Sequence, residues 1–348
     1  MARSSGTHAA DKRPPVAVGH VRLNVKDVGA APYWLTRVMK VHIHGNCQSF
    51  VLFHMLKEVC PDWDISFYEV HAEPIMQNLA DYRALIGAAD IVLSQPIHPG
   101  YRDTTELSLS WIRDYVKPSA ALIVIPALHF SGHHPEFAAL ARLGDLCQNS
   151  VAAHLTMIGM APDRAVDLLL SADLFDDATI RTEIYLQLVE MNRRETSDGI
   201  DASVADIVTS QAVWFQMFHI VNHPSRALCA YLINRVFERL DLKQRVTIAG
   251  TDYMDNPHLP MCSAIARFCS ANGPEPPDWL PREPRVLMPN RHPTEVPDYL
   301  AEMMQQLRRH TAADIEAAIE ADWRSSEFLG RLAKSGAAIP EIETWRRE

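Results

Sequence analysis

The fold is decided by the stretch Val41-His42-Ile43-His44-Gly45-Asn46-Cys47-Gln48-Ser49, in which an apolar strand runs directly into the start of a helix. Gly45 allows a tight turn there, and Cys47 falls beside the unpaired amides and the positive dipole end of the helix. Such a position stabilises a thiolate and lowers the pKa of the thiol. We therefore predict that Cys47 is a nucleophile, with the amides of Asn46 and Gln48 as donors to an oxyanion. The alternative is that Cys47 is a small, buried apolar residue.

Strand and helix patterns alternate after this turn. Strands are predicted at residues 41–44, 64–70, 90–93 and 120–125, and helices at 48–59, 75–88 and 105–116. Strands that alternate with helices form a parallel sheet covered on both faces. The sequence therefore predicts an α/β fold with a small parallel sheet.

A large helical part follows residue 126. Helices are predicted at residues 136–147, 149–160, 162–171, 177–193, 203–221 and 225–240, and again at 297–309 and 311–323. Between these groups lies a proline-rich stretch that cannot form a continuous helix or a central strand. We expect an N-terminal arm over residues 1–39 and an α/β plus helical catalytic domain over 40–270. Residues 271–348 are expected to form a proline-rich connector and C-terminal helices packed on the same domain.

Composition and charge argue against several classes of protein. The chain has 348 residues, of which 47% are hydrophobic, and a formal net charge of -10. No stripe rich in Lys and Arg is present, so a nucleic-acid surface is not expected. The six cysteines are scattered without a CxxC pair, and no apolar stretch reaches the ~20 residues that span a bilayer. We expect a cytoplasmic protein without a signal peptide or membrane span, whose partners are small molecules.

Polar residues follow the predicted strands at the edge where parallel sheets bind ligands. Ser94 and Gln95 end the third strand, and Arg102 lies farther along the same loop. His134 lies in the loop after the fourth strand. With Asn46, these residues are the candidates for binding a ligand, and Arg102 is the candidate cation for a phosphate.

A fourth turn, Asn222-His223-Pro224-Ser225, lies between two predicted helices. Pro224 suits the first turn of the second helix, which leaves His223 beside a positive helix end. That field favours the neutral imidazole, the form that a general base needs. We predict that His223 is the base that serves Cys47; the alternative is a capping or core histidine.

Other histidines raise the question of a metal site. His42 and His44 share one face of the first strand by its two-residue period, and with Cys47 they form a possible zinc set. The spacing matches no standard ligand pattern, so no metal is expected. For the cluster His129, His133 and His134, surface, loop-pinning and metal-binding roles stay open.

The turns described above together resemble the WcbI family of polysaccharide-biosynthesis acetyltransferases. The resemblance covers about residues 40 to 240 and rests on an ordered set of motifs: Gly45-Asn46-Cys47-Gln48, Ser94-Gln95-Pro96, Phe130-Ser131-Gly132-His133-His134-Pro135 and Asn222-His223-Pro224-Ser225. It implies a fold of the SGNH or flavodoxin type, with cysteine where SGNH hydrolases carry serine. It also implies binding of coenzyme A or acetyl-coenzyme A.

Carried over by position, the resemblance implies Cys47 as the active-site thiol with Gln48 beside it. Gln95 and His134 would line the pocket, and His223 would be the partner histidine. The acid that SGNH enzymes carry two or three residues before this histidine is missing here. Asn222 or a carboxylate from elsewhere must then orient the ring, or the site works as a dyad.

Three functions of different class follow from these observations. The first is coenzyme A-dependent transfer of an acyl group, in first place acetyl, to a hydroxyl of a sugar or polysaccharide precursor such as that of a capsule. The second is hydrolysis of an ester or thioester by an enzyme of the SGNH type, with water as the acceptor. The third is a non-catalytic module that binds a nucleotide or a glycan at the strand ends.

Overall fold

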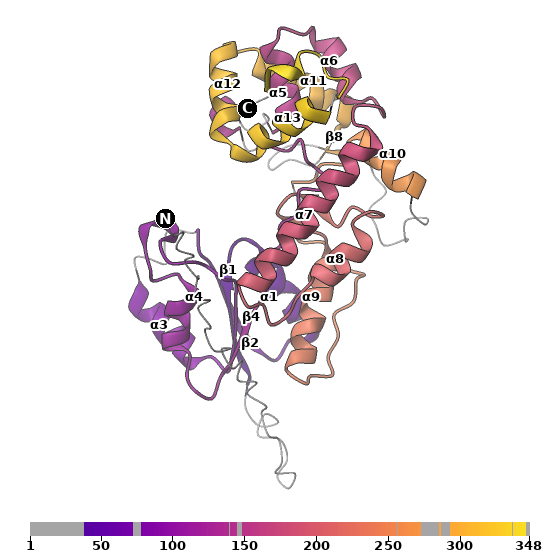
Figure 1. Ribbon diagram of the computed structural model, residues 1–348. Coiled ribbons are helices and arrows are strands. Elements are labelled where there is room, and N and C mark those ends of the chain that lie inside the picture. The colour runs from indigo at the N-terminus through magenta and orange to yellow at the C-terminus, as the bar shows by residue number, and fades with distance from the viewer. Residues whose placement is uncertain are drawn as a thin grey trace, which may run out of the picture. The chain divides into compact units, whose positions relative to one another are not determined.

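The computed structural model describes residues 38–71, 78–138, 140–144, 148–255, 257–272, 285–286, 293–335 and 337–345 (Figure 1). The expected N-terminal arm lies outside the described residues as far as residue 37, and so does most of the expected connector, residues 273–284 and 287–292.

A parallel four-stranded sheet forms the base of the candidate site. Its strands are β1 (Lys40–Gly45), β2 (Asp64–Glu69), β3 (Ile91–Ser94) and β4 (Ala121–Val124), in the order β2-β1-β3-β4. The connecting helices are α1 (Gln48–Val59), α3 (Leu79–Ala88) and α4 (Leu109–Tyr115). The predicted α/β class is therefore confirmed. In this strand order the chain reverses its direction of winding between β1 and β3, which is where such sheets bind ligands.

Alternation along β1 assigns its side chains to the two faces of the sheet. Val41 and Ile43 are buried in the same core cluster as the apolar face of α1, whereas the other face meets α3 and α4 (Figure 1). There, His42 Nε2 lies 3.2 Å from the hydroxyl of Tyr82, and His44 Nδ1 also contacts this hydroxyl. His42 Nδ1 pairs with Ser66, and His44 Nε2 donates to the Leu107 carbonyl. The two imidazoles thus anchor α3 and its neighbouring loop to the sheet.

The rest of the chain is mostly helical. Its helices are α5 (Ser150–Met157), α6 (Pro162–Leu169), α7 (Asp177–Ser197), α8 (Ala205–Gln211), α9 (Arg226–Arg239), α10 (Ser263–Asn272), α11 (Val296–Leu307), α12 (Ala312–Ala321) and α13 (Trp323–Ser335). Short 3-10 turns are η2 (Tyr101–Asp103), η3 (Ala141–Leu143) and η4 (Ile342–Trp345). Two small antiparallel pairs join β5 (Phe218–Ile220) to β6 (His223–Pro224) and β7 (Arg285–Val286) to β8 (Thr294–Glu295). None of the helices in the described residues is long and apolar enough to cross a membrane.

One predicted helix is wrong, and another is too long. Over residues 136–147 the described chain is a loop with the turn η3, because Phe137 pairs with Asn149 in a β-bridge and Gly144 has a left-handed φ of 113°. Over residues 203–221 the helix ends at Gln211, and the chain then enters β5. The hairpin β5-β6 places Pro224 before the helix, since the N-cap of α9 is Ser225. His223 is therefore a strand residue and does not adjoin the first helical turn.

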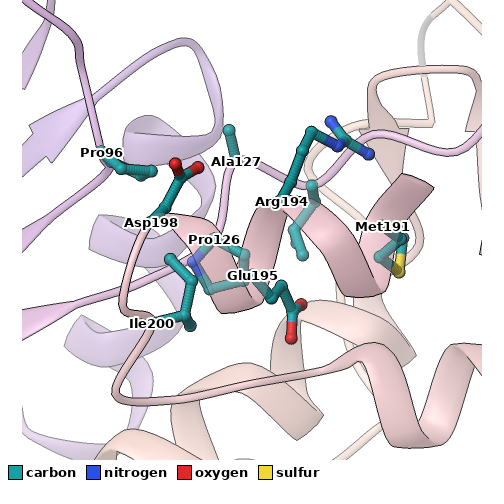
Figure 2. Close-up of a pocket in the computed structure, with 9 residues that line it drawn as sticks. Pro96, Pro126, Ala127, Met191, Arg194, Glu195, Asp198 and Ile200 are labelled. Carbon is teal, nitrogen blue, oxygen red and sulfur yellow. The ribbon is translucent and has the colours of Figure 1, made fainter. Parts of the chain in front are cut away.

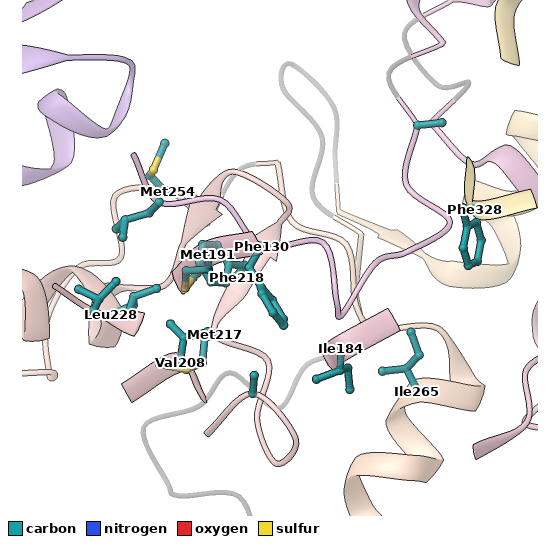
Figure 3. Packing of buried hydrophobic residues seen from close by; sticks show 14 of the residues in the cluster. Phe130, Ile184, Met191, Val208, Met217, Phe218, Leu228, Met254, Ile265 and Phe328 are labelled. Carbon is teal, nitrogen blue, oxygen red and sulfur yellow. The ribbon is translucent and has the colours of Figure 1, made fainter. Parts of the chain in front are cut away.

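The hairpin is held by the main hydrophobic core. Phe218 packs against Phe130, with ring centroids 5.8 Å apart, and Met191 of α7 lies beside them (Figure 3). All three side chains are nearly inaccessible to solvent. The loop after β4, the helix α7 and the hairpin are thus one packed unit, which fixes where His223 is presented.

The C-terminal helices pack on α5 and α6. Helices α11 and α12 contact α5, and α11 also contacts α6. His154 of α5 donates from Nε2 to the Pro340 carbonyl at 2.9 Å and accepts at Nδ1 from the Trp345 indole, also at 2.9 Å. Arg331 of α13 forms a two-pronged ion pair with Glu183 of α7, at 2.6 and 2.7 Å. These contacts join segments more than a hundred residues apart in the sequence.

Candidate functional site

The side chain of Gln48 is the hub of the candidate site. Its Oε1 accepts from the Leu128 amide at 3.0 Å and from Gln95 Nε2 at 2.9 Å. Its Nε2 donates to the carbonyls of Leu128, at 2.6 Å, and Asn222, at 2.9 Å. Both amide hydrogens of Gln48 are therefore committed to backbone carbonyls. The expectation that the side-chain amide of Gln48 is free to bind an oxyanion is therefore wrong: this amide ties the helix start to two loops.

Asn46 and Gln95 complete the turn before the helix. The Asn46 amide donates to Gln95 Oε1 at 2.8 Å, and Asn46 Oδ1 accepts from the Gln48 amide at 3.0 Å. Ser94 is fully buried and donates to the carbonyl of Gln95 at 3.0 Å. A Cβ on Gly45 would lie 2.6 Å from Gln95 Oε1. Glycine is thus required here for close packing against Gln95, which the turn argument from the sequence did not anticipate.

Cys47 lies at the start of α1, half-buried, with helical φ and ψ of -53° and -21°. Burial and then the negative charge of Glu69 raise the pKa of the Cys47 thiol above its ordinary value. The backbone amides of Cys47 and Gln48 lower this pKa, as expected at a helix start, but their effect is smaller. The expectation of an acidic thiol is therefore wrong for the free protein, because desolvation and a like charge outweigh the helix terminus.

The raised pKa of Cys47 gives a direct test. We expect iodoacetamide to alkylate Cys47 with an apparent pKa above ~8.5, the free-thiol value. Glu69→Gln removes the repelling charge and should lower this pKa, whereas Glu316→Gln, at an exposed position of α12, should leave it unchanged. An apparent pKa below the free-thiol value, or no response to Glu69→Gln, would contradict this description of the thiol.

His223 meets the same network through its neighbour in the chain. Gln48 follows Cys47 and binds the carbonyl of Asn222, which precedes His223. His223 Nδ1 lies 3.3 Å from the carbonyl of Met254, so Nδ1 carries the hydrogen and Nε2 is left as the acceptor. Burial is the main cause that lowers the pKa of His223, so the ring is neutral at neutral pH. The imidazole is thus oriented by a backbone carbonyl and not by Asn222.

A half-buried acid and two further histidines support the loop that holds His223. Asp252 Oδ2 accepts from His219 Nε2 at 2.9 Å and from the Arg226 amide at 2.8 Å. His219 Nδ1 is then the acceptor for His258 Nδ1, 2.7 Å away. Asp252 Oδ1 accepts from the Met254 amide at 3.2 Å. The carboxylate that the sequence lacks before His223 is therefore present in space, where it fixes the loop and not the ring itself.

Arg226, the first residue of α9, anchors the other end of this loop. Its guanidinium donates to both carboxylate oxygens of Glu58, at 3.0 and 2.5 Å, and to the carbonyls of Ala249 and Thr251. Gly250 between them has a φ of 132°, and a Cβ there would lie 2.7 Å from the Arg226 guanidinium carbon. Because Glu58 belongs to α1, this contact ties the loop to the helix that begins beside Cys47.

The structure places His134 and Arg102 away from this network. His134 is buried, its Nε2 accepts from Gln216 at 3.1 Å, and burial lowers its pKa to about 3. Arg102 lies in the exposed turn η2 and donates to the His71 carbonyl at 2.5 Å. Among the described residues, neither forms a hydrogen bond with Cys47, Gln48 or His223.

A cavity of about 90 Å³ adjoins the network at the carboxyl ends of β3 and β4 (Figure 2). Most of its lining is apolar, and Arg194, Glu195 and Asp198 of α7 and its C-cap add charges: Pro96, Pro126, Ala127, Leu128, Met191, Arg194, Glu195, Asp198 and Ile200. Leu128 is shared with the network, because both its amide and its carbonyl bind Gln48. Sequence reasoning missed this cavity, since α7 supplies one wall from almost seventy residues farther along the chain.

Comparisons with known proteins identify a family and a similar fold. The sequence profile of the family described as polysaccharide biosynthesis enzyme WcbI matches residues 40–245. The fold is similar to a solved structure of WcbI, described as the native protein without a disulfide bond between coenzyme A and one of its cysteines. The similarity has a TM-score of 0.67 at 20% sequence identity and covers 90% of this chain and 100% of that chain. No curated protein matches the sequence.

Proposed function

Because this chain belongs to the WcbI family of polysaccharide biosynthesis enzymes, we propose that it transfers an acyl group, in first place acetyl, from coenzyme A to a hydroxyl of a sugar or polysaccharide precursor. The proposed site consists of Cys47 and His223, with Gln48 as the positioning residue between them. All three lie within residues 40–270, the segment proposed as the catalytic domain, and the proposed location is the cytoplasm.

The hydrogen bond from Gln48 to the Asn222 carbonyl carries this proposal. It joins the residue after Cys47 to the residue before His223, and so brings together two turns that lie far apart in the sequence. The related WcbI structure is described as the native protein without a disulfide bond between coenzyme A and one of its cysteines, so coenzyme A and a cysteine are named together for that protein. In this chain, Cys47 lies just after the end of β1, at the edge where parallel sheets bind ligands.

The state of the two groups suggests how they act. Cys47 is protonated at neutral pH and His223 is neutral, so Nε2 of His223 can take the thiol proton as Sγ bonds to the acyl carbon. His223 then gives this proton to the departing thiolate of the donor. In the second half, His223 takes the proton of the acceptor hydroxyl as its oxygen bonds to the acyl carbon, and returns it to Cys47 Sγ.

The residues around the cavity suit a thioester donor with a long uncharged arm. Pro96, Pro126 and Leu128 offer apolar surface beside Gln48. We propose that Asn46, Ser94 and Gln95 hold the turn against which this arm lies, that His134 supports the neighbouring loop from inside the core, and that Arg102 adds a cation after β3. When bound, the donor supplies an activated acyl group; the chain supplies its orientation and the proton transfers.

Release of coenzyme A from acetyl-coenzyme A, followed with a thiol reagent, tests this function. We expect one equivalent of coenzyme A to be released as Cys47 is acylated, and further release to depend on an added sugar or glycan acceptor. Release without an acceptor, accompanied by free acetate, would instead indicate a hydrolase. Binding without any release would indicate a non-catalytic module.

Coenzyme A is also expected to stabilise the folded protein. A ligand at a hundredfold excess over its dissociation constant adds ~2.7 kcal/mol to the free energy of unfolding. The melting midpoint should therefore rise with coenzyme A. A rise with a nucleotide sugar and none with millimolar coenzyme A would contradict the proposed donor.

A further inference from the structure

Two arginines from different helices meet at one histidine beside the cavity. Arg194 of α7 donates from Nη2 to the carbonyl of His129 at 2.9 Å. Arg324 of α13 donates from Nη1 to His129 Nε2, also at 2.9 Å. The guanidinium of Arg324 lies 5.5 Å from the ring centroid of Trp323, whose side chain is 64% exposed. His129, in the loop after β4, thus holds two positively charged side chains close together, and one of them, Arg324, is exposed to solvent.

The surrounding carboxylates do not match these charges. Glu190 is bound in two-pronged fashion by Arg193, at 2.7 and 2.8 Å, and lies 3.6 Å from Arg194 Nε. Arg194 Nε is buried and forms no hydrogen bond in the described part of the chain. Glu190 is therefore shared by Arg193 and Arg194, and both of its oxygens are bound by Arg193.

The acidic residues of the cavity are turned to other partners. Glu195 accepts hydrogen bonds from Ser203 and from the amides of Val204 and Ala205, at 3.2 and 3.3 Å. Asp198 lies 3.5 Å from His98, and it acts on Arg194 through its charge, without a hydrogen bond between the two in the described part of the chain. Burial, followed by the charges of Arg324 and Arg194, lowers the pKa of His129 to about 3, so this ring is neutral and can accept from Arg324.

The arginine pair is continuous with the proposed active site. His129 directly follows Leu128, whose amide and carbonyl bind Gln48 beside Cys47. Arg194 itself lines the cavity, and the wall between Arg194 and Gln48 is apolar, formed by Pro126, Ala127 and Leu128. The cavity thus combines a positively charged end at Arg194 with an apolar wall toward Gln48.

We propose that Arg194 and Arg324, held together on His129, form a subsite for a phosphate or diphosphate group whose uncharged remainder lies along the cavity wall toward Gln48 and Cys47. Guanidinium groups match phosphate oxygens with paired, charge-assisted hydrogen bonds. Two sources carry such a group in the proposed reaction: the coenzyme and an acceptor sugar linked to a nucleoside diphosphate. The identity of the ligand rests on the proposed function, whereas the affinity for a phosphate group does not.

Calorimetric titration with inorganic pyrophosphate, coenzyme A, UDP-glucose and pantetheine tests the subsite. Arg324 is exposed, so Arg324→Ala should leave the fold intact. We expect Arg324→Ala and Arg194→Ala each to weaken pyrophosphate binding by about tenfold or more, as for loss of a charge-assisted hydrogen bond. Arg181→Ala is the matched control: it removes the same charge from an exposed position of the same helix, and should change the affinity by less than about threefold. Pantetheine, which lacks phosphate, should bind all variants equally.

The same titrations identify the source. Weaker coenzyme A binding in Arg324→Ala assigns the subsite to the donor, and weaker UDP-glucose binding assigns it to the acceptor; either supports the proposal. Wild-type affinity of Arg324→Ala for all phosphate-bearing probes, or equal losses in Arg181→Ala, would overturn it. Loss of pyrophosphate affinity together with an absence of acyl transfer would leave the subsite standing and contradict the proposed function.

Discussion

Replacing Cys47 with alanine is expected to lower the rate of acyl transfer by about a thousandfold or more, because the sulfur that forms the bond to the acyl carbon is lost. His223→Ala should have an effect of similar size, since Cys47 is protonated at neutral pH and needs a base. Neither residue belongs to the fully buried core, so both variants should melt close to the wild type. The rate is measured as acceptor-dependent release of coenzyme A.

Matched substitutions separate chemistry from folding. Cys60→Ala removes a thiol from the other end of α1, and His71→Ala removes an exposed imidazole; both should retain activity. If Cys47 and His223 act as one unit, the double variant should be about as slow as either single variant. Additive losses would mean independent roles, and unfolding of either single variant would indicate a structural role.

Acidification below pH 6.5 is expected to unfold the protein. The histidines concerned are buried in the folded state, and burial lowers their pKa to about 3 for His42 and His134 and about 4 for His44 and His133. In the unfolded chain these rings titrate near ~6.5. Unfolding therefore takes up protons below that pH. The stability that the neutral rings provide is fully present above pH 6.5 and is lost as the pH falls toward the folded pKa values.

The expected size of this loss is large. Each such imidazole removes about 2 kcal/mol from the free energy of unfolding at pH 5, and domains have only about 5–15 kcal/mol in total. Glu136 opposes the trend, because burial raises its pKa to about 7 and its protonation then stabilises the fold as the pH falls from 7 toward 4.5. The stabilisation from Glu136 is about equal to the loss from one of these histidines, so the histidines together still lower the free energy of unfolding.

Urea unfolding at several pH values measures this dependence. We expect the free energy of unfolding to fall steeply between pH 6.5 and 5, with a slope that corresponds to several protons. His134→Gln should reduce this slope by about one proton. His98→Gln, at a side chain that is 77% exposed, should leave it unchanged. Equal free energies of unfolding at pH 7.5 and 5 would contradict the description of these rings as buried and neutral.

Local patterns in the sequence predicted the sheet and the helix that begins beside Cys47. The four strands and α1 carry apolar residues with the correct period, and each lies within about two residues of its predicted position. The hairpin β5-β6 was not predicted, because a short run of apolar residues is equally consistent with the end of a buried helix and with a strand. Gly144, whose φ is positive, lies inside the helix that was predicted at residues 136–147. A glycine there was a sign against that helix.

The sequence predicted which residues meet at the strand ends, but not most of the hydrogen bonds between them and the distant loops. Strand ends indicated that Asn46, Gln48 and Gln95 meet, and the hydrogen bonds confirm that they do. The number of partners of Gln48 could not be predicted, because two of its bonds go to backbone carbonyls in distant loops. Asp252 and Arg194 carried no local signal. Their positions depend on how α7 and the loop before α10 pack, which only the tertiary structure provides.

The mass of the intact protein after mixing with acetyl-coenzyme A tests the central claim most directly. We predict that the mass rises by one acetyl group within a turnover, that the group maps to Cys47, and that an added sugar acceptor removes it. Cys47→Ala should show no such increase, and His223→Ala should acquire it far more slowly. Acetyl transfer to the acceptor at full rate in Cys47→Ala, or an acetyl group that stays on Cys47 in the presence of every acceptor, would contradict the proposed chemistry.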